Sequence, residues 1–168
     1  MMKKVFALLI TAGIYSTGAA QNMSMNILVR NSGKVNVNET VMLEVTVCNL
    51  DATVVAATYK LRPQISVPAT VVVADAGHVL PPGWSITASR GSQVWLSNGT
   101  DSIAGGDCRT ILLAMKGITP GAASTVSGNL LFSNGMAPGN IRGTSLRGDV
   151  PEDNHSTSTV EVTAKGKQ

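Results

Sequence analysis

The sequence has few of the residues on which nucleic-acid-binding proteins depend. Only 14% of its 168 residues are charged and 4% are aromatic. The basic residues are scattered, and outside the leader that contains Lys3 and Lys4, eleven basic residues stand against ten acidic ones. Because binding to a phosphate backbone requires clustered basic side chains, we predict no nucleic-acid partner.

Catalytic patterns are also missing from the sequence. The only histidines, His78 and His155, lie beside turns and belong to no G-x-S-x-G or H-E-x-x-H pattern. No two acidic residues fall in a recognisable glycosidase setting. We therefore predict no catalytic residue, no cofactor and no enzymatic activity.

One acidic group leaves two interpretations open. Residues 149–155 (DVPEDNH) offer the oxygen ligands that Ca²⁺ prefers, but they lack the D-x-D-x-D-G spacing of a calcium loop. The group is either a calcium site or a solvated loop. We favour the loop and assign no metal ligand.

Long apolar runs are absent after the first 20 residues. Residues 1–20 have a basic head, an apolar stretch at 5–14 and the small residues Gly18, Ala19 and Ala20. This is the pattern of a cleaved Sec signal peptide, whereas a membrane anchor would need about 20 consecutive apolar residues. We expect cleavage after Ala20, which leaves residues 21–168 as one domain in the periplasm, at the cell surface or outside the cell.

Alternating apolar side chains dominate the remaining sequence. Residues 41–49 (VMLEVTVCN) place every second side chain on one apolar face, which predicts a half-buried strand. Residues 108–117 (CRTILLAMKG) form a matching segment, and together the two should lie at the centre of a two-sheet sandwich. Further strands are expected at residues 25–30, 53–61, 69–75, 84–89, 93–97, 124–134 and 156–164.

Turn residues separate these predicted strands. Pro63 and Pro68 restrict the segment between them to a sheet edge or a connection, and Asn98–Gly99 is typical of a hairpin turn. Residues 135–151 are rich in glycine and predict a surface loop. Many short strands with no amphipathic helix indicate an all-β sandwich.

The two cysteines flank the two central strands. Cys48 closes one predicted strand and Cys108 opens the other, so a disulfide between neighbouring strands or across the sheets is plausible in an exported protein. The alternative is a pair of partly buried thiols.

Trp95 is the one aromatic residue that we single out as a possible exposed binding residue. It lies on the opposite face of its strand from Val94 and Leu96. An exposed tryptophan would favour carbohydrate binding, whereas one or two tryptophans in a sandwich more often cap the core.

Several motifs, taken in order, resemble the DUF11 repeat of bacterial surface proteins. They are Val45–Asn49 (VTVCN), Leu80–Trp84 (LPPGW), Ala104–Ile111 (AGGDCRTI) and the run from Asp149 through Asn154 to Val162. The resemblance implies an immunoglobulin-like antiparallel β-sandwich, which would comprise about 7–9 strands. It also implies an adhesive or structural role for an exported module, with an unidentified protein or surface partner.

Two alternatives to this role stay open. The chain could be a filament or pilin-like subunit that self-associates by strand donation. It could also be a small secreted carbohydrate-binding protein.

Overall fold

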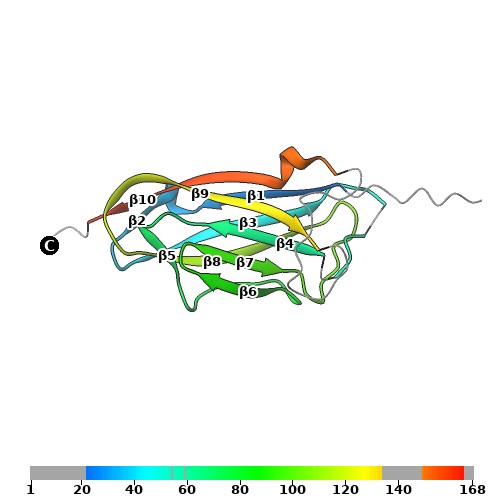
Figure 1. The fold of residues 1–168 in the computed structure, drawn as a ribbon, viewed down its shortest axis with the longest axis horizontal. Helices are drawn as coiled ribbons and strands as arrows, with labels where there is room; N and C mark the ends of the chain where they lie inside the picture. The colour runs from blue at the N-terminus through cyan, green and yellow to red at the C-terminus, as the bar shows by residue number, and fades with distance from the viewer. Residues whose placement is uncertain (1–21, 54, 59, 134–148, 165–168) are drawn as a thin grey trace, which may run out of the picture.

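The computed structural model describes residues 22–53, 55–58, 60–133 and 149–164. The described chain forms two sheets that pack face to face, with the strands running along the long axis of the molecule (Figure 1). The strands are β1 (Met23–Val29), β2 (Lys34–Asn36), β3 (Thr40–Asn49), β4 (Leu61–Ser66), β5 (Val71–Val73), β6 (Ser85–Arg90), β7 (Gln93–Ser97), β8 (Cys108–Gly117), β9 (Gly121–Phe132) and β10 (His155–Thr163). Two short 3-10 turns are η1 (Asn31–Gly33) and η2 (Pro151–Asn154).

The strand order confirms the predicted fold class. One sheet has the order β1-β3-β8-β5 and the other the order β2-β10-β9-β4-β7-β6. Neighbouring strands are antiparallel except β10 and β2, which are parallel. The described chain is therefore an immunoglobulin-like β-sandwich, with ten strands rather than about 7–9.

The two strands predicted to be central are neighbours in the middle of the four-stranded sheet. Val45 of β3 pairs with Ile111 of β8, and both side chains are fully buried. The alternation seen in the sequence is the cause, because every second residue of each strand points into the core. The largest fully buried side chains are Phe132, Met23, Leu43, Leu61, Ile65, Leu96, Ile103, Ile111, Leu113, Met115, Leu130 and Val41.

The edge strand β1 is closed by side chains from the opposite sheet. The backbone N–H groups of Ile27 and Val29 donate to the hydroxyl oxygens of Ser156 and Ser158 on β10, at 3.1 and 3.0 Å. The N–H of Met23 donates to Asp149 Oδ1 at 2.9 Å. These bonds join the two sheets along one side and satisfy donors that an edge strand would otherwise expose.

Two predictions around β4 are wrong. Residues 53–61 do not form a strand in the described part of the chain. Ala56 makes an isolated bridge to Ile103, Val55 is exposed, and Leu61 begins β4. This segment crosses from one sheet to the other, so it cannot remain paired along its length. Residues 54 and 59 lie outside the described residues.

The segment between Pro63 and Pro68 is not an edge or a connection, because β4 lies between β9 and β7 inside the six-stranded sheet. The N–H of Leu61 points toward the β7 side, where it donates to Asn98 Oδ1 at 3.1 Å. Since alternate residues face the same neighbour, the nitrogen of Pro63 also faces β7. The ladder with β7 begins one residue later, at Gln64, so the proline removes no hydrogen bond from it.

Asn98–Gly99 lies in a turn, as predicted, because the N–H of Asp101 donates to the carbonyl oxygen of Asn98 at 2.7 Å. The turn does not close a hairpin, since the hairpin that contains β7 turns at Gly91–Ser92, between β6 and β7. The Asn98 side chain is fully buried. Its amide nitrogen donates to the carbonyl oxygens of Ala57 and Asp101, both at 2.8 Å. The side chain thus fastens the crossover before β4 to the loop after β7.

The predicted signal peptide at residues 1–20 lies outside the described residues, as does most of the predicted loop at 135–151. The other predicted strands are present, those at residues 93–97 and 108–117 with the predicted ends and the rest with shifted ends. Their inward-facing residues Val126, Leu130, Phe132, Val160 and Val162 are buried as expected.

Candidate functional site

A polar surface crosses the outer face of the six-stranded sheet. Ala88, Trp95, Gln64, Asn129 and His155 pair laterally from β6 to β10 and form one row. Arg90, Gln93, Ser66, Ser127 and Thr157 pair in the same way and form a second row. We call these ten residues the outer rows.

The outer rows are almost uncharged. Amides and hydroxyls predominate, and Arg90 at the edge is their only arginine or lysine. Trp95 is partly exposed between Gln64 and Ala88, so it neither caps the core nor stands free of its neighbours. The surface offers many hydrogen-bonding groups around one aromatic ring, an arrangement that suits a protein interface.

The outer rows end at β6, which pairs only with β7 in the described part of the chain. The register between β6 and β7 shifts between Ile86 and Ala88, which makes Thr87 a bulge. The Thr87 hydroxyl donates to the carbonyl oxygen of Trp95 at 3.2 Å. A bulge twists an edge strand and makes pairing with another chain less favourable.

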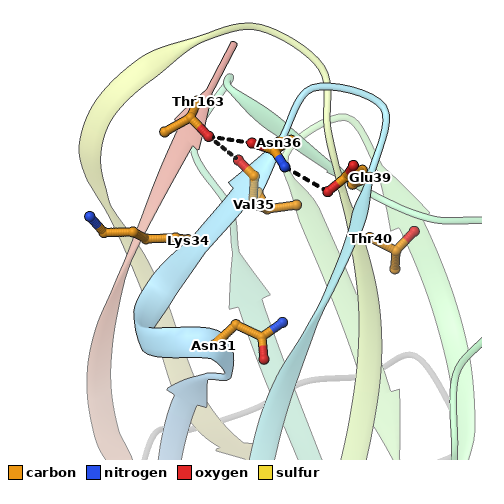
Figure 2. A pocket seen from close by; sticks show the side chains of 7 residues that line it. All are labelled: Asn31, Lys34, Val35, Asn36, Glu39, Thr40 and Thr163. Atoms are coloured by element: carbon orange, nitrogen blue, oxygen red, sulfur yellow. Dashed lines mark hydrogen bonds between the residues drawn. The ribbon is translucent and has the colours of Figure 1, made fainter. Parts of the chain in front are cut away.

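A small polar pocket lies at one end of the sandwich, between β2 and the start of β3 (Figure 2). Its volume is about 130 Å³, and its lining residues are Asn31, Lys34, Val35, Asn36, Glu39, Thr40 and Thr163. Pockets for drug-sized ligands usually measure about 300–1,000 Å³. This pocket therefore suits only a small group.

Hydrogen bonds fix the polar groups of this pocket. The Thr163 hydroxyl donates to Asn36 Oδ1 at 2.6 Å, and Asn36 Nδ2 donates to Glu39 Oε2 at 2.8 Å. The Lys34 side chain extends away from Glu39 (Figure 2), and its Nζ lies 3.5 Å from Glu161 Oε2. The pocket thus presents one carboxylate together with amides and hydroxyls.

Cys48 and Cys108 form the predicted disulfide, in the neighbouring-strand arrangement. The two residues pair directly in the β3–β8 ladder, and their Cα atoms are 4.0 Å apart. The bond closes the end of the central strand pair, where the ladder stops.

A cluster around Asp101 went unpredicted. Trp84 is 6% exposed, and its Nε1–H donates to Asp101 Oδ2 at 2.7 Å. Arg109 Nε donates to the same oxygen at 2.9 Å. A buried indole N–H requires an acceptor. Trp84, which follows the turn Pro81–Pro82–Gly83, was therefore the residue in the sequence that could have predicted a buried hydrogen-bonding cluster. The cluster holds the loop before β8 against β6 and has no free group for chemistry.

Both histidines make structural hydrogen bonds. His78 lies in the connection that follows β5, and its Nδ1 accepts the backbone N–H of Ala114 in β8 at 3.0 Å. His155 Nδ1 lies 2.8 Å from Asn129 Oδ1 in the outer rows. The described contacts place neither ring beside a nucleophilic side chain.

The acidic group at residues 149–155 anchors the start of β1. Asp149 accepts from the N–H of Met23 and from Asn154 Nδ2, while Asn22 Oδ1 accepts the N–H of Val150 at 3.2 Å. The described residues include no group of three or more His, Cys, Asp or Glu residues that could hold a metal ion. Burial raises the pKa of Asp153, and the neighbouring carboxylates of Asp149 and Glu152 raise it further.

Comparison with known proteins shows that this chain is similar in fold to several solved structures. No family model matches the chain, and no curated protein matches it. A cohesin module from a family 33 glycoside hydrolase of Clostridium perfringens is similar, with a TM-score of 0.56 and 9% identity over 86% of this chain and 100% of the module. The CARDB domain of PF1109 from Pyrococcus furiosus has a TM-score of 0.52 and 12% identity over 86% of this chain and 90% of that domain.

The major pilin subunit BcpA of Bacillus cereus has a TM-score of 0.51 and 9% identity over 86% of this chain, which corresponds to 41% of the pilin. At these identities the similarity concerns the fold alone. No helix in the described ranges has the length and hydropathy needed to cross a membrane.

Proposed function

We propose that the chain is an exported, non-enzymatic immunoglobulin-like module of the DUF11 type that binds a protein partner through its outer rows. The observation that carries this proposal is the broad, nearly uncharged polar face that surrounds the partly exposed Trp95. Interfaces are depleted in charged residues at their centre and enriched in tryptophan. The same face is built from five laterally paired strands, so it holds its groups in fixed positions.

Export is supported by two independent features. Residues 1–20 follow the signal-peptide pattern, and the protein contains a disulfide, which persists in oxidising compartments outside the cytoplasm. Intact-mass measurement of the exported protein should give a chain that begins at Gln21 and is lighter than the reduced chain by two hydrogen atoms.

A binding role is better supported than catalysis. The polar pocket is small, and both histidines are engaged with the backbone or with an amide of the described chain. A binding module is also better supported than a strand-donating filament subunit, because side chains from β10 already occupy the N–H groups of Ile27 and Val29 on the open side of β1.

Site-specific photo-crosslinking in the source cells tests the proposal. A photo-reactive amino acid is placed at Gln64 in the outer rows and, as a matched control, at Thr110 on the outer face of the four-stranded sheet. We expect an adduct with another protein from position 64 and little or none from position 110.

Each alternative predicts a different outcome of this experiment. Adducts from position 110 only, or from neither position, would contradict the assignment of the outer rows. Adducts of the chain with itself would instead identify the filament subunit.

A carbohydrate-binding role is the second candidate, and the polar pocket favours it. The fixed amides, hydroxyls and carboxylate of Asn36, Glu39 and Thr163 are groups that can hydrogen-bond sugar hydroxyls. If this role holds, binding to a glycan array should be lost in Asn36→Ala and kept in Gln64→Ala. Equal glycan binding by the two variants would exclude the polar pocket as the carbohydrate-binding site.

A further inference from the structure

Among the described residues, Arg62 is a buried cation without a counter-charge. The residue is 4% exposed, and its Nε and Nη2 atoms have no hydrogen-bond partner in the part of the chain that the structure describes. The ion pairs of the described residues involve other cations, namely Arg30, Lys34 and Arg109. A guanidinium stays charged at any relevant pH, so an unpaired one in this position is costly to the fold.

Ser97 lies beside Arg62 on the same face of the sheet. Gln64 pairs with Trp95, so continuing this register by two residues sets Arg62 opposite Ser97. The bond from the Leu61 N–H to Asn98 shows that the two segments still run side by side at this level. The Cβ atoms of such a pair are typically about 4.5–5.5 Å apart.

Ser97 is also buried and has a hydrogen to donate. It is 2% exposed, and its hydroxyl oxygen accepts the backbone N–H of Gly99 at 3.2 Å. This bond uses a lone pair of the oxygen and leaves the O–H hydrogen for another acceptor. Two adjacent buried side chains therefore offer donors.

The surroundings supply no acidic side chain to these donors. Among the outer-face positions of β4, β7 and β9, Arg62 is the only charged residue. The nearby carboxylate of Asp101 is engaged by Trp84 and Arg109. Residues 134–148, which follow β9 in the sequence, contain no aspartate or glutamate.

We propose that Arg62 and Ser97 form a binding site for a carboxylate group. The planar guanidinium can give two parallel N–H bonds to the two oxygens of a carboxylate, and the serine hydroxyl can add a third. One guanidinium balances the single charge of a carboxylate, whereas a phosphate ester carries about −1.5 to −2. A small organic acid and a peptide C-terminus present the same group. The site goes beyond the proposed function, and neither proposal depends on the other.

Thermal unfolding of the purified protein in sodium acetate tests the site, with sodium chloride replacing acetate at constant ionic strength. For the unsubstituted protein, we expect Tm to rise and to level off, by about 2–4 °C once acetate exceeds its Kd several-fold. Arg62→Met should fold, since it removes an unpaired buried charge, and its Tm should not respond to acetate. Arg90→Met is the matched control at an exposed arginine and should respond like the unsubstituted protein.

Two further arms identify the group that binds. Acetamide, which is neutral, should leave Tm unchanged. A short peptide with a free C-terminus that raises Tm, when its amidated form does not, identifies a peptide carboxylate as the natural ligand; a response to acetate alone identifies a small acid.

The carboxylate site is overturned if the unsubstituted protein shows no acetate-specific rise in Tm. It is equally overturned if Arg62→Met shows the same rise, or if acetamide is as effective as acetate. The proposed partner face would stand in all three cases, because the crosslinking at Gln64 does not depend on the anion.

Discussion

The non-glycine residues with positive φ gather at the end of the sandwich that holds the polar pocket. Asn31, Ser32 and Asn38 are the non-glycine residues in this region of φ in the described chain, and Gly33 adjoins them with φ of +72°. Asn31 also lines the pocket. The local backbone is therefore held by its surroundings in a conformation that most residues disfavour.

Gly33 provides a direct test of how tightly this end is packed. A Cβ atom at Gly33 would lie 2.5 Å from the carbonyl oxygen of Thr159, whereas at Gly106, with φ of +80°, it would meet nothing within 4 Å. Both alanine variants carry the cost of the left-handed conformation, about 1–2 kcal/mol. We expect Gly33→Ala to lower the free energy of unfolding clearly more than Gly106→Ala in urea denaturation. Equal losses would mean that β10 and η1 are not in close contact.

The raised pKa of Asp153 predicts a pH dependence of stability. Because burial favours the protonated carboxyl, the folded chain holds this proton at a higher pH than the unfolded chain does. The contribution of Asp153 to stability therefore falls as pH rises from its ordinary pKa through the raised one. Asp153→Asn should raise Tm at pH 7 relative to the unsubstituted protein, and the difference should shrink toward acid pH. A pH-independent difference would contradict the assigned cause.

At the scale of elements, the bonds from β10 to β1 join the two sheets without a shared strand. Ser156→Ala with Ser158→Ala would leave the N–H groups of Ile27 and Val29 without their acceptors. An unsatisfied buried donor costs about 1–3 kcal/mol. We expect faster hydrogen exchange at Ile27 and Val29, measured residue by residue.

The control for this pair is Thr157→Ala with Thr159→Ala, which alters the exposed face of the same strand. These two substitutions should leave the exchange of Ile27 and Val29 unchanged. If both double variants accelerated exchange equally, the effect would come from β10 itself and not from its serine hydroxyls.

The disulfide acts on the central strand pair. It spans 60 residues of sequence, so its removal should cost up to about 4 kcal/mol through the entropy of the unfolded chain. Cys48→Ala with Cys108→Ala should show this loss in urea denaturation. Reductant should destabilise the unsubstituted protein by a similar amount and leave the double variant unaffected. A reductant effect on the double variant would contradict this account.

The strands that the sequence predicts best are those with one buried face. The alternation in β3 and β8 follows directly from the geometry of a strand with one side in the core, so their positions could be read from the residues. β4 could not, because Pro63 argues against an interior strand unless the direction of each N–H is known. The strand predicted at residues 53–61 is the opposite case, because there the composition argues for a strand that does not form. An apolar, β-branched composition does not reveal that a segment crosses between sheets.

The candidate sites were less predictable than the fold. Trp95 could be assigned to an outer face by counting residues from Val94 and Leu96, and the structure places it partly exposed on that face. The outer rows depend on lateral register across five strands, which a single sequence does not encode locally. Arg62 appeared as one scattered basic residue, and only its burial distinguishes it from the others.

At the scale of the whole molecule, the described chain is a closed sandwich whose edges are short, bulged or capped. β2 and β5 each have three residues, β6 carries the bulge at Thr87, and side chains from β10 cover β1. Natural β-proteins use these devices to prevent pairing with other chains. The fold is similar to that of a pilin subunit, but these edges favour a separate module that binds through a face.

The central claim is that protected edges keep the chain a separate module and prevent its assembly with other copies. Size-exclusion chromatography with light scattering, over a wide range of protein concentrations, tests this claim most directly. We predict the mass of a single chain at every concentration, because each edge is protected and the outer rows are polar. Discrete oligomers or growing filaments would contradict the account and would make the edge strands, β6 first, the sites of assembly.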